Sequence, residues 1–208
     1  TAVWSEFIST GGGGGIARAD CALGQSGGAI YAFEAERTWA LTNFYANCAT
    51  LDSAGTGINT WQRTLGPYGS ERNVNTYGVG RCDYEPGYNK VVIGAKVYKD
   101  AYGYAIGIQV KCGTLPTGSY YSIKPVLGLT SANVQDIDCP ANQVALGIYV
   151  AYGGILDKFG LRCGPVSGAD QSSISITSTT GTFGSTITLQ TSGGSGGGAV
   201  TYARTVGT

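Results

Sequence analysis

The sequence predicts an all-β protein with a three-repeat, disulfide-bonded body and a short C-terminal β-sheet. Glycine supplies 35 of the 208 residues, and acidic and basic residues number only 13 each. This composition is typical of an extracellular, β-rich protein with many tight turns. Six cysteines divide the chain into three stretches of similar make-up. Short apolar runs beside those cysteines alternate with polar residues, as half-buried strands require.

Residues 1–10 predict an N-terminal strand, because apolar side chains recur along them before a run of five glycines, Gly11 to Gly15. Such a run has no propensity for regular structure, so we expect a linker or a loop of close backbone approach. The run lacks the lysine and the hydroxyl residue that complete a phosphate-binding loop. The apolar residues expected in the strand are Val3, Trp4, Phe7 and Ile8.

Residues 11–166 predict the three-repeat body. In the second and third repeats, segments 90–98 and 143–150 are apolar runs with a central glycine, and both repeats then alternate apolar and polar residues up to a cysteine. The first repeat, around 28–48, is the most divergent. A period of about 60 residues lies outside the common solenoid repeats, so three blades around a shared axis fit better than an open array.

The even number of cysteines predicts three disulfides formed outside the cytoplasm. A zinc site is disfavoured because the chain has no histidine and no Cys-x-x-Cys pair. The sequence leaves the connectivity open, and we prefer the pairing that closes each repeat on itself. The preferred pairs are Cys21–Cys48, Cys82–Cys112 and Cys139–Cys163.

Residues 167–208 change to a Ser/Thr-rich alternation that predicts strands at 173–177, 186–190 and 199–203. Here a glycine-rich turn precedes an Ala-Val-Thr-Tyr strand, which resembles the opening strands of bacterial immunoglobulin-like repeats. Because a complete sandwich takes about seven strands and about 100 residues, the resemblance implies an incomplete immunoglobulin-like sheet.

Three strands cannot cover a hydrophobic face, and their open edges favour pairing with another segment. One explanation is that they pack on the body of the same chain, or that the natural chain continues beyond Thr208. The other is strand donation, in which segment 3–8 of one subunit fills the sheet of the next. A head-to-tail exchange does not close on itself, so it would generate a filament.

The three-repeat body resembles the β-prism proteins, a group that includes jacalin-like lectins and the vitelline outer-layer proteins. The likeness rests on the glycine-rich opening, on the apolar run after Cys139 and on segment 153–163. The resemblance implies three four-stranded sheets around a pseudo-threefold axis.

The resemblance also implies a sugar-binding loop. Jacalin-like lectins bind sugar through backbone amides and the Asp of a Gly-x-x-x-Asp loop, and segment 153–157 has that form. Neither of the first two repeats keeps the carboxylate, since the matching positions are Thr42 and Ile106. A tyrosine nearby would stack on a pyranose face. The residues implied are Gly153, Gly154, Asp157 and Tyr152, with Tyr149 as the other candidate ring.

An ordinary hairpin is the alternative, in which Asp157 accepts amides of its own turn. Catalysis is not expected, because a chain without histidine lacks the usual base and proton shuttle. Two pairs of carboxylates two positions apart share a strand face, but they project in parallel, which disfavours a glycosidase arrangement. These pairs are Glu34 with Glu36 and Asp136 with Asp138.

No cofactor or metal is expected. Asp83 and Glu85 could bind calcium with loop carbonyls, but nothing resembles an EF-hand loop and a solvated turn is favoured. Balanced charge disfavours nucleic acid and anionic membranes as partners. No apolar run reaches the roughly 18–20 residues that span a bilayer. A chain that starts at Thr1 and contains no methionine predicts a processed export product.

The sequence therefore predicts a secreted, non-enzymatic protein of the extracellular space or cell surface. The preferred function is a structural subunit that assembles with copies of itself, by β-strand exchange, into a fibre or surface layer. The alternative is a carbohydrate-binding lectin or adhesin of the β-prism type, with glycans as partners. Tyrosines concentrated in and just after the second repeat offer contact area for an interface, or else cover a sheet face in a chain poor in large aliphatic residues.

Overall fold

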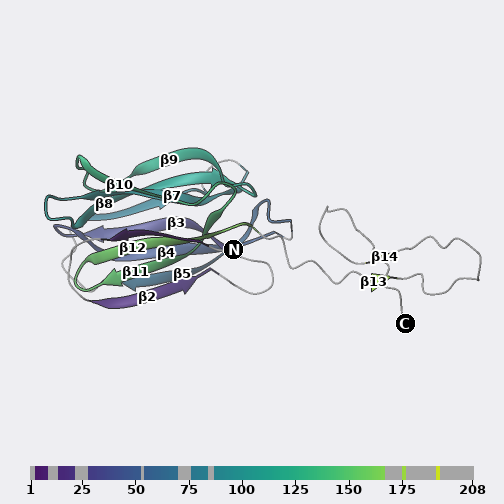
Figure 1. Ribbon diagram of the computed structural model, residues 1–208, viewed down its shortest axis with the longest axis horizontal. Helices are drawn as coiled ribbons and strands as arrows, with labels where there is room; N and C mark the ends of the chain where they lie inside the picture. Colours follow the sequence, from purple (N-terminus) through teal and green to yellow (C-terminus); the bar gives the residue numbers. More distant parts are fainter. Residues whose placement is uncertain are drawn as a thin grey trace, which may run out of the picture.

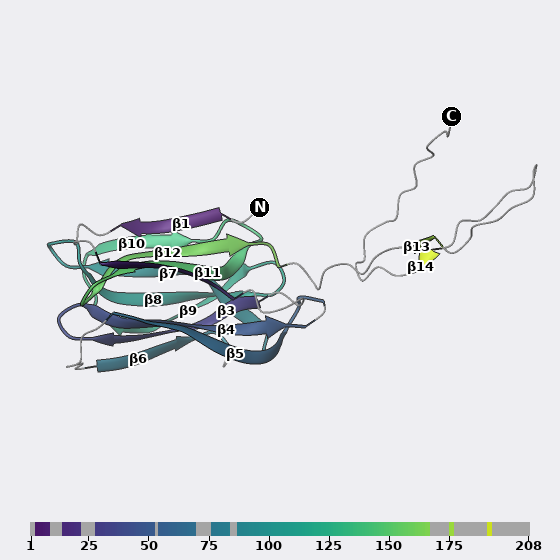
Figure 2. The same ribbon diagram turned by 90° about the horizontal axis from the view of Figure 1, so that it is seen from below.

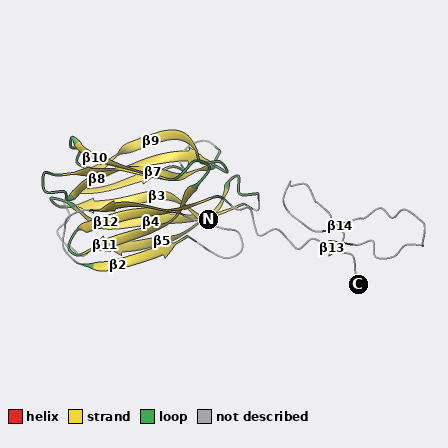
Figure 3. Ribbon diagram, viewed as in Figure 1, coloured by secondary structure: helices red, strands yellow, loops and turns green. Residues whose placement is uncertain are grey.

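The computed structural model describes residues 3–8, 14–21, 28–52, 54–69, 76–83, 87–166, 175–176 and 191–192. The regular structure in these ranges is entirely β-strand (Figure 3), which confirms the all-β class. Among them we find no helix with the length and apolarity needed to cross a membrane.

Three antiparallel four-stranded sheets form the body (Figure 1). The first sheet has the order β5-β4-β3-β6, and its strands are β3 (Gly28–Arg37), β4 (Leu41–Leu51), β5 (Ile58–Tyr68) and β6 (Thr76–Arg81). The second has the order β10-β7-β8-β9, with β7 (Lys90–Lys99), β8 (Ala105–Thr114), β9 (Ser119–Gly128) and β10 (Asn133–Asp138). The third has the order β1-β12-β11-β2, with β1 (Val3–Ile8), β2 (Gly15–Asp20), β11 (Val144–Tyr152) and β12 (Leu156–Gly164).

The three sheets share one topology, as the β-prism resemblance implied. Each is a central hairpin (β3–β4, β7–β8 or β11–β12) with one further strand on either side. The third sheet combines the first two strands of the chain with the last two strands of the body, because β1 pairs with β12 and β2 pairs with β11. Segment 1–10 was expected to stand ahead of the body, and its strand is an edge strand of the body instead. Figure 2 shows β1 along that edge, next to β10.

A β-bulge recurs at the same place in each central hairpin. One residue of the first hairpin strand is left without a register partner, and its carbonyl accepts the amide of the cysteine that follows the sheet's outer strand. A bulge re-aims the chain locally, and here it brings a cysteine against the next sheet. The bonds are Cys82 to Tyr31 at 2.9 Å, Cys139 to Ile93 at 2.8 Å and Cys21 to Leu146 at 2.8 Å.

The three preferred disulfide pairs are all present. The expectation that each closes one repeat on itself was wrong, because each joins one sheet to the next. In every case the first cysteine follows the outer strand of one sheet (β2, β6 or β10) and the second lies in a central strand of another (β4, β8 or β12). The disulfides therefore close a ring of three sheets.

The core lies on the shared axis. Three buried phenylalanine rings meet there: Phe33 is 5.2 Å from Phe44 and 5.4 Å from Phe159, and the last two rings are 5.2 Å apart. Phe44 and Phe159 each lie four residues before a disulfide cysteine, and Ile108 fills the matching position in β8. Removing a buried phenylalanine ring typically costs about 3–5 kcal/mol, so this cluster is a large part of what holds the sheets together.

The C-terminal region is described at two short strands, β13 (Ser175–Ile176) and β14 (Thr191–Ser192), which pair antiparallel. β13 falls within the strand expected at 173–177. The strands expected at 186–190 and 199–203, and with them the immunoglobulin-like resemblance, lie outside the described residues.

Candidate functional site

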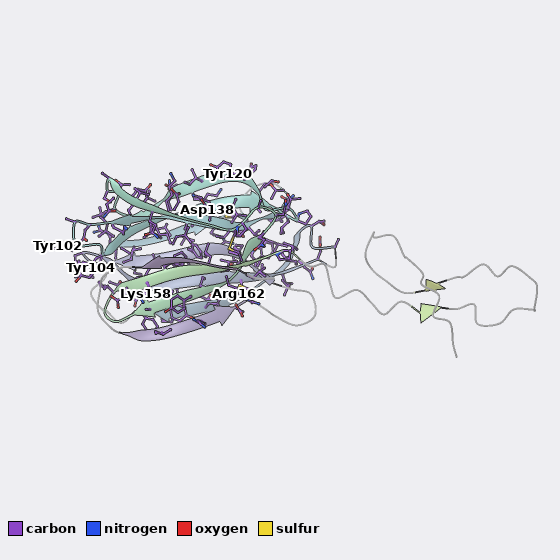
Figure 4. The ribbon with its side chains drawn as sticks, in the orientation of Figure 1. Tyr102, Tyr104, Tyr120, Asp138, Lys158 and Arg162 are labelled. Carbon is purple, nitrogen blue, oxygen red and sulfur yellow. A yellow bond between two sulfur atoms is a disulfide. The ribbon has the colours of Figure 1, made fainter. Side chains whose placement is uncertain are left out.

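The candidate sugar-binding turn lies at one end of the prism. In Figure 4, Tyr102 and Tyr104 of the β7–β8 turn mark that end, and Lys158 at the start of β12 lies nearer to it than Arg162. The shared topology places the β3–β4 and β11–β12 turns at the same end. The three equivalent turns can therefore be compared directly.

Asp157 is the second residue of β12 and is only 5% exposed. Burial raises the pKa of its carboxyl group, and a hydrogen bond from the Gly153 amide opposes part of that rise. The expected alternative, in which Asp157 accepts an amide of its own turn, is thus present. One such bond leaves acceptor capacity on the carboxylate, since each of its two oxygens has two lone-pair sites.

The glycine run contributes to this end of the prism through Gly14 and Gly15. A Cβ atom at Gly14 would overlap the carbonyl of Tyr152 and lie 2.6 Å from the amide nitrogen of Gly153. At Gly15 a Cβ atom would lie 3.2 Å from the Tyr152 ring. The expectation of close backbone approach is confirmed for Gly14, and the remaining glycines, 11–13, lie outside the described residues.

Tyr152, not Tyr149, is the tyrosine beside the turn. It is the last residue of β11, and its half-buried ring is 5.4 Å from the ring of Tyr68 at the end of β5. Tyr149 lies further along the strand, where the guanidinium of Arg18 covers its ring at 5.2 Å. The contribution of Tyr68 was missed from the sequence, because no local pattern links the end of β5 to the end of β11.

The equivalent residues of the other two hairpins are buried as well, but they carry no charge. Thr42 donates its hydroxyl to the carbonyl of Glu36 at 3.2 Å, and Ile106 is apolar. The turns of these two hairpins touch through Trp39 and Tyr104, whose ring centroids are 5.2 Å apart. Of the three hairpins, β11–β12 is thus the one with an ionisable side chain at this position.

The carboxylate pairs considered for catalysis are held by neighbouring side chains. Glu34 accepts from the amide of Asn47 at 2.6 Å, and Glu36 accepts from that of Asn43 at 2.5 Å. Burial, followed by the charges of Glu36 and Glu34, raises the pKa of Tyr45. The other pair, Asp136 with Asp138, is bound by the ammonium group of Lys111.

The calcium candidates do not come together as a site in the described part of the chain. Asp83 is buried and accepts from Arg81 at 2.9 and 2.5 Å and from the indole nitrogen of Trp61 at 2.7 Å. Glu85 lies outside the described residues. Within the residues that are described, no group of three or more potential metal ligands is found.

Comparison with known proteins reveals the fold but no sequence family. No family model matches the chain, and no curated protein matches it. Solved structures do match: a mannose-binding jacalin-related lectin from Ananas comosus has a TM-score of 0.51 at 14% identity, covering 79% of this chain and 98% of the lectin. Artocarpin in complex with methyl-α-mannose has a TM-score of 0.52 at 13% identity, covering 78% and 97%. Single-chain recombinant jacalin has a TM-score of 0.50 at 13% identity, covering 79% and 95%.

Proposed function

We propose that this protein is a non-enzymatic, carbohydrate-binding lectin of the β-prism type, with its sugar site at the β11–β12 turn. The observation that carries the proposal is Asp157, a buried carboxylate in a Gly-x-x-x-Asp turn that has a neutral counterpart in each equivalent hairpin. The fold is shared with mannose-binding lectins, so we propose a mannose-type hexose as the ligand.

The proposed chemistry uses hydrogen bonds to the sugar hydroxyls. The carboxylate of Asp157 accepts from one or two hydroxyl groups, and backbone amides of the turn donate to sugar oxygens. Hydrogen bonds to a charged group contribute about 1.5–3 kcal/mol each, which is enough to orient a small ligand. The ring of Tyr152 offers an apolar face to the C–H groups of the pyranose.

Gly14, just before β2, leaves room for this arrangement. Because Gly14 has no side chain, its backbone lies directly against the Tyr152–Gly153 peptide, at the start of the turn that carries Asp157. Backbone groups recognise a ligand closely only where no side chain stands between them.

We also propose an extracellular location, which three disulfides favour. Assembly into a fibre remains an untested prediction, and the likeness to lectins supports the carbohydrate-binding alternative better. Strands Val3–Ile8 and Leu156–Gly164 pair within one chain, so exchange between subunits requires β1 to leave its own sheet. The side chains of Val3, Trp4, Phe7 and Ile8 lie outside the described part of the structure.

Isothermal titration calorimetry with methyl-α-mannoside tests the proposal. We expect the full chain to bind and Asp157→Asn to weaken binding at least about tenfold, corresponding to the loss of one charged hydrogen bond. Asp52→Asn is the matched control, because Asp52 makes its contacts to Thr56 in the exposed β4–β5 connection. Absence of mannoside binding to the unmodified chain, or equal affinities for all three proteins, would refute the proposed site.

A further inference from the structure

A groove with a volume of about 590 Å³ lies against the second sheet. Its lining comes from β7, β8, the β8–β9 turn, β9, the end of β10 and the connection that follows β10. Figure 4 shows two of its residues, Tyr120 and Asp138, well away from the end of the prism marked by Tyr102 and Tyr104. The groove is therefore separate from the Asp157 turn, and its volume lies in the range of small-ligand sites, about 300–1,000 Å³.

Fixed charges line one part of this groove. The ammonium group of Lys111, with a side chain only 12% exposed, lies 2.7 and 2.8 Å from the two carboxylate oxygens of Asp138 and also contacts Asp136. Burial alone lowers the pKa of Lys111, but hydrogen bonds to both aspartates outweigh that effect and raise it. Lys111 therefore stays cationic and holds Asp138, whose side chain is about half exposed.

A glycine in β7 makes this arrangement possible. Gly94 is the register partner of both Asp138 and Lys111, and a Cβ atom there would overlap a carboxylate oxygen of Asp138. The third sheet has the same arrangement of a glycine between two oppositely charged residues. Gly147 is the register partner of both Asp20 and Arg162, whose charged groups are 2.9 Å apart. In the first sheet the matching positions hold Ala32, Arg81 and Asn47.

Apolar groups line the rest of the groove. Tyr120 of β9 is 65% exposed, and Ile123, three residues further along the same strand, is also exposed. Ile93, the bulged residue of β7, also lines the groove and packs against Gly113. An exposed aromatic ring beside aliphatic groups and fixed polar groups suits a ligand with both apolar and polar faces.

We propose that this groove is a second carbohydrate site, which binds an N-acetylated pyranose and does so independently of Asp157. The pyranose face would stack on Tyr120, the acetamido methyl would contact Ile93 and Ile123, and Asp138 would accept from a hydroxyl or the acetamido N–H. A neutral sugar fits the charge of the groove, because Lys96 and Lys111 balance Asp136 and Asp138.

Titration of the full chain with triacetylchitotriose tests this second site. Cellotriose is the matched ligand, since it has the same linkage and lacks the acetamido groups. We expect binding of triacetylchitotriose, at least about tenfold weaker binding of cellotriose, and a similar loss for Tyr120→Ala and for Asp138→Asn, as expected when one good contact is removed. Tyr120→Phe, which keeps the ring, and Tyr102→Ala, an exposed tyrosine of the distant turn, should bind normally.

The two sites are distinguished by the Asp157→Asn variant. It should lose methyl-α-mannoside binding and keep triacetylchitotriose binding, whereas Tyr120→Ala should do the reverse. The second site is overturned if the unmodified chain does not bind triacetylchitotriose, if cellotriose binds equally well, or if Tyr120→Ala and Asp138→Asn both bind it normally. Circular dichroism of each variant verifies that its fold is intact.

Discussion

The β11–β12 hairpin differs from the β3–β4 and β7–β8 hairpins at one buried position. The second residue of the second strand is Asp157 in one case and Thr42 or Ile106 in the others, and all three side chains are buried. Around them the scaffold is the same: an equivalent bulge, an equivalent disulfide and the same strand order. The fold thus accepts an apolar, a hydroxyl or a carboxyl side chain here without a change of architecture.

This difference indicates which hairpin has a role beyond folding. Burial of a carboxylate is unfavourable unless it is well hydrogen-bonded, as the raised pKa of Asp157 reflects. The threonine and isoleucine show that the scaffold does not need a charge at this position. A side chain that weakens the fold and is not required by it is best explained by ligand binding.

Gly14→Val is expected to have the largest effect on sugar binding. Even a Cβ atom at this position overlaps the carbonyl of Tyr152, so the β1–β2 connection must move away from the β11–β12 turn. We expect no measurable affinity for methyl-α-mannoside by calorimetry. Gly15→Ala, whose Cβ would meet the Tyr152 ring at 3.2 Å, should lower the affinity only a few-fold. Normal binding by the Gly14 variant would contradict the proposed role of this loop.

Tyr152→Ala is expected to have an intermediate effect, because an aromatic contact contributes about 0.5–1.5 kcal/mol beyond its buried area. This corresponds to about threefold to tenfold weaker binding of the mannoside. Tyr152→Phe keeps the ring and should bind as the unmodified chain does. If alanine and phenylalanine variants bind equally well, the ring does not contact the sugar.

Asp157→Asn should make the protein more stable at neutral pH while it weakens mannoside binding. Burial raises the pKa of Asp157 above its ordinary value of 3.8. The native state therefore binds this proton more tightly than the unfolded state does. The resulting contribution to stability is full below pH 3.8 and is lost as the pH rises through the raised pKa. Thermal unfolding should show the variant a few degrees more stable at pH 7, with the difference shrinking toward pH 3. A variant less stable than the parent at pH 7 would contradict this account.

Thr42→Val should have the smallest effect on binding and a modest effect on stability. It removes the hydroxyl that donates to the carbonyl of Glu36, and loss of one such bond costs about 1 kcal/mol. Urea unfolding should show this loss, and calorimetry should show unchanged mannoside affinity. Weaker sugar binding would mean that the three hairpins do not act separately.

The sequence was sufficient to predict the class of fold, the three repeats and the cysteine pairs, because strand alternation and cysteine spacing are local patterns. It did not reveal that each disulfide joins two sheets. That arrangement depends on bulges at Tyr31, Ile93 and Leu146, which place each cysteine against its neighbouring sheet, and a bulge leaves no unambiguous mark in the sequence.

The candidate site likewise contains residues that a local motif predicts and residues that only the topology reveals. Asp157 and its turn were predicted from a motif within one hairpin, whereas the contribution of Tyr68 required knowledge of which strands meet at the end of the prism. The position of segment 3–8 in the third sheet could not be predicted either, because its partner strand β12 lies about 150 residues further along the chain. Contacts between elements distant along the chain are set by the topology rather than by local composition.

The most direct test of the central claim is a titration of the ¹⁵N-labelled chain with methyl-α-mannoside, followed by nuclear magnetic resonance. The account predicts amide shifts concentrated at Gly14, Gly15 and residues 152–157, with the turns around Trp39 and Tyr102 unaffected. Shifts centred on either of those two turns, or no shifts at all, would contradict the claim that one hairpin of the three binds sugar.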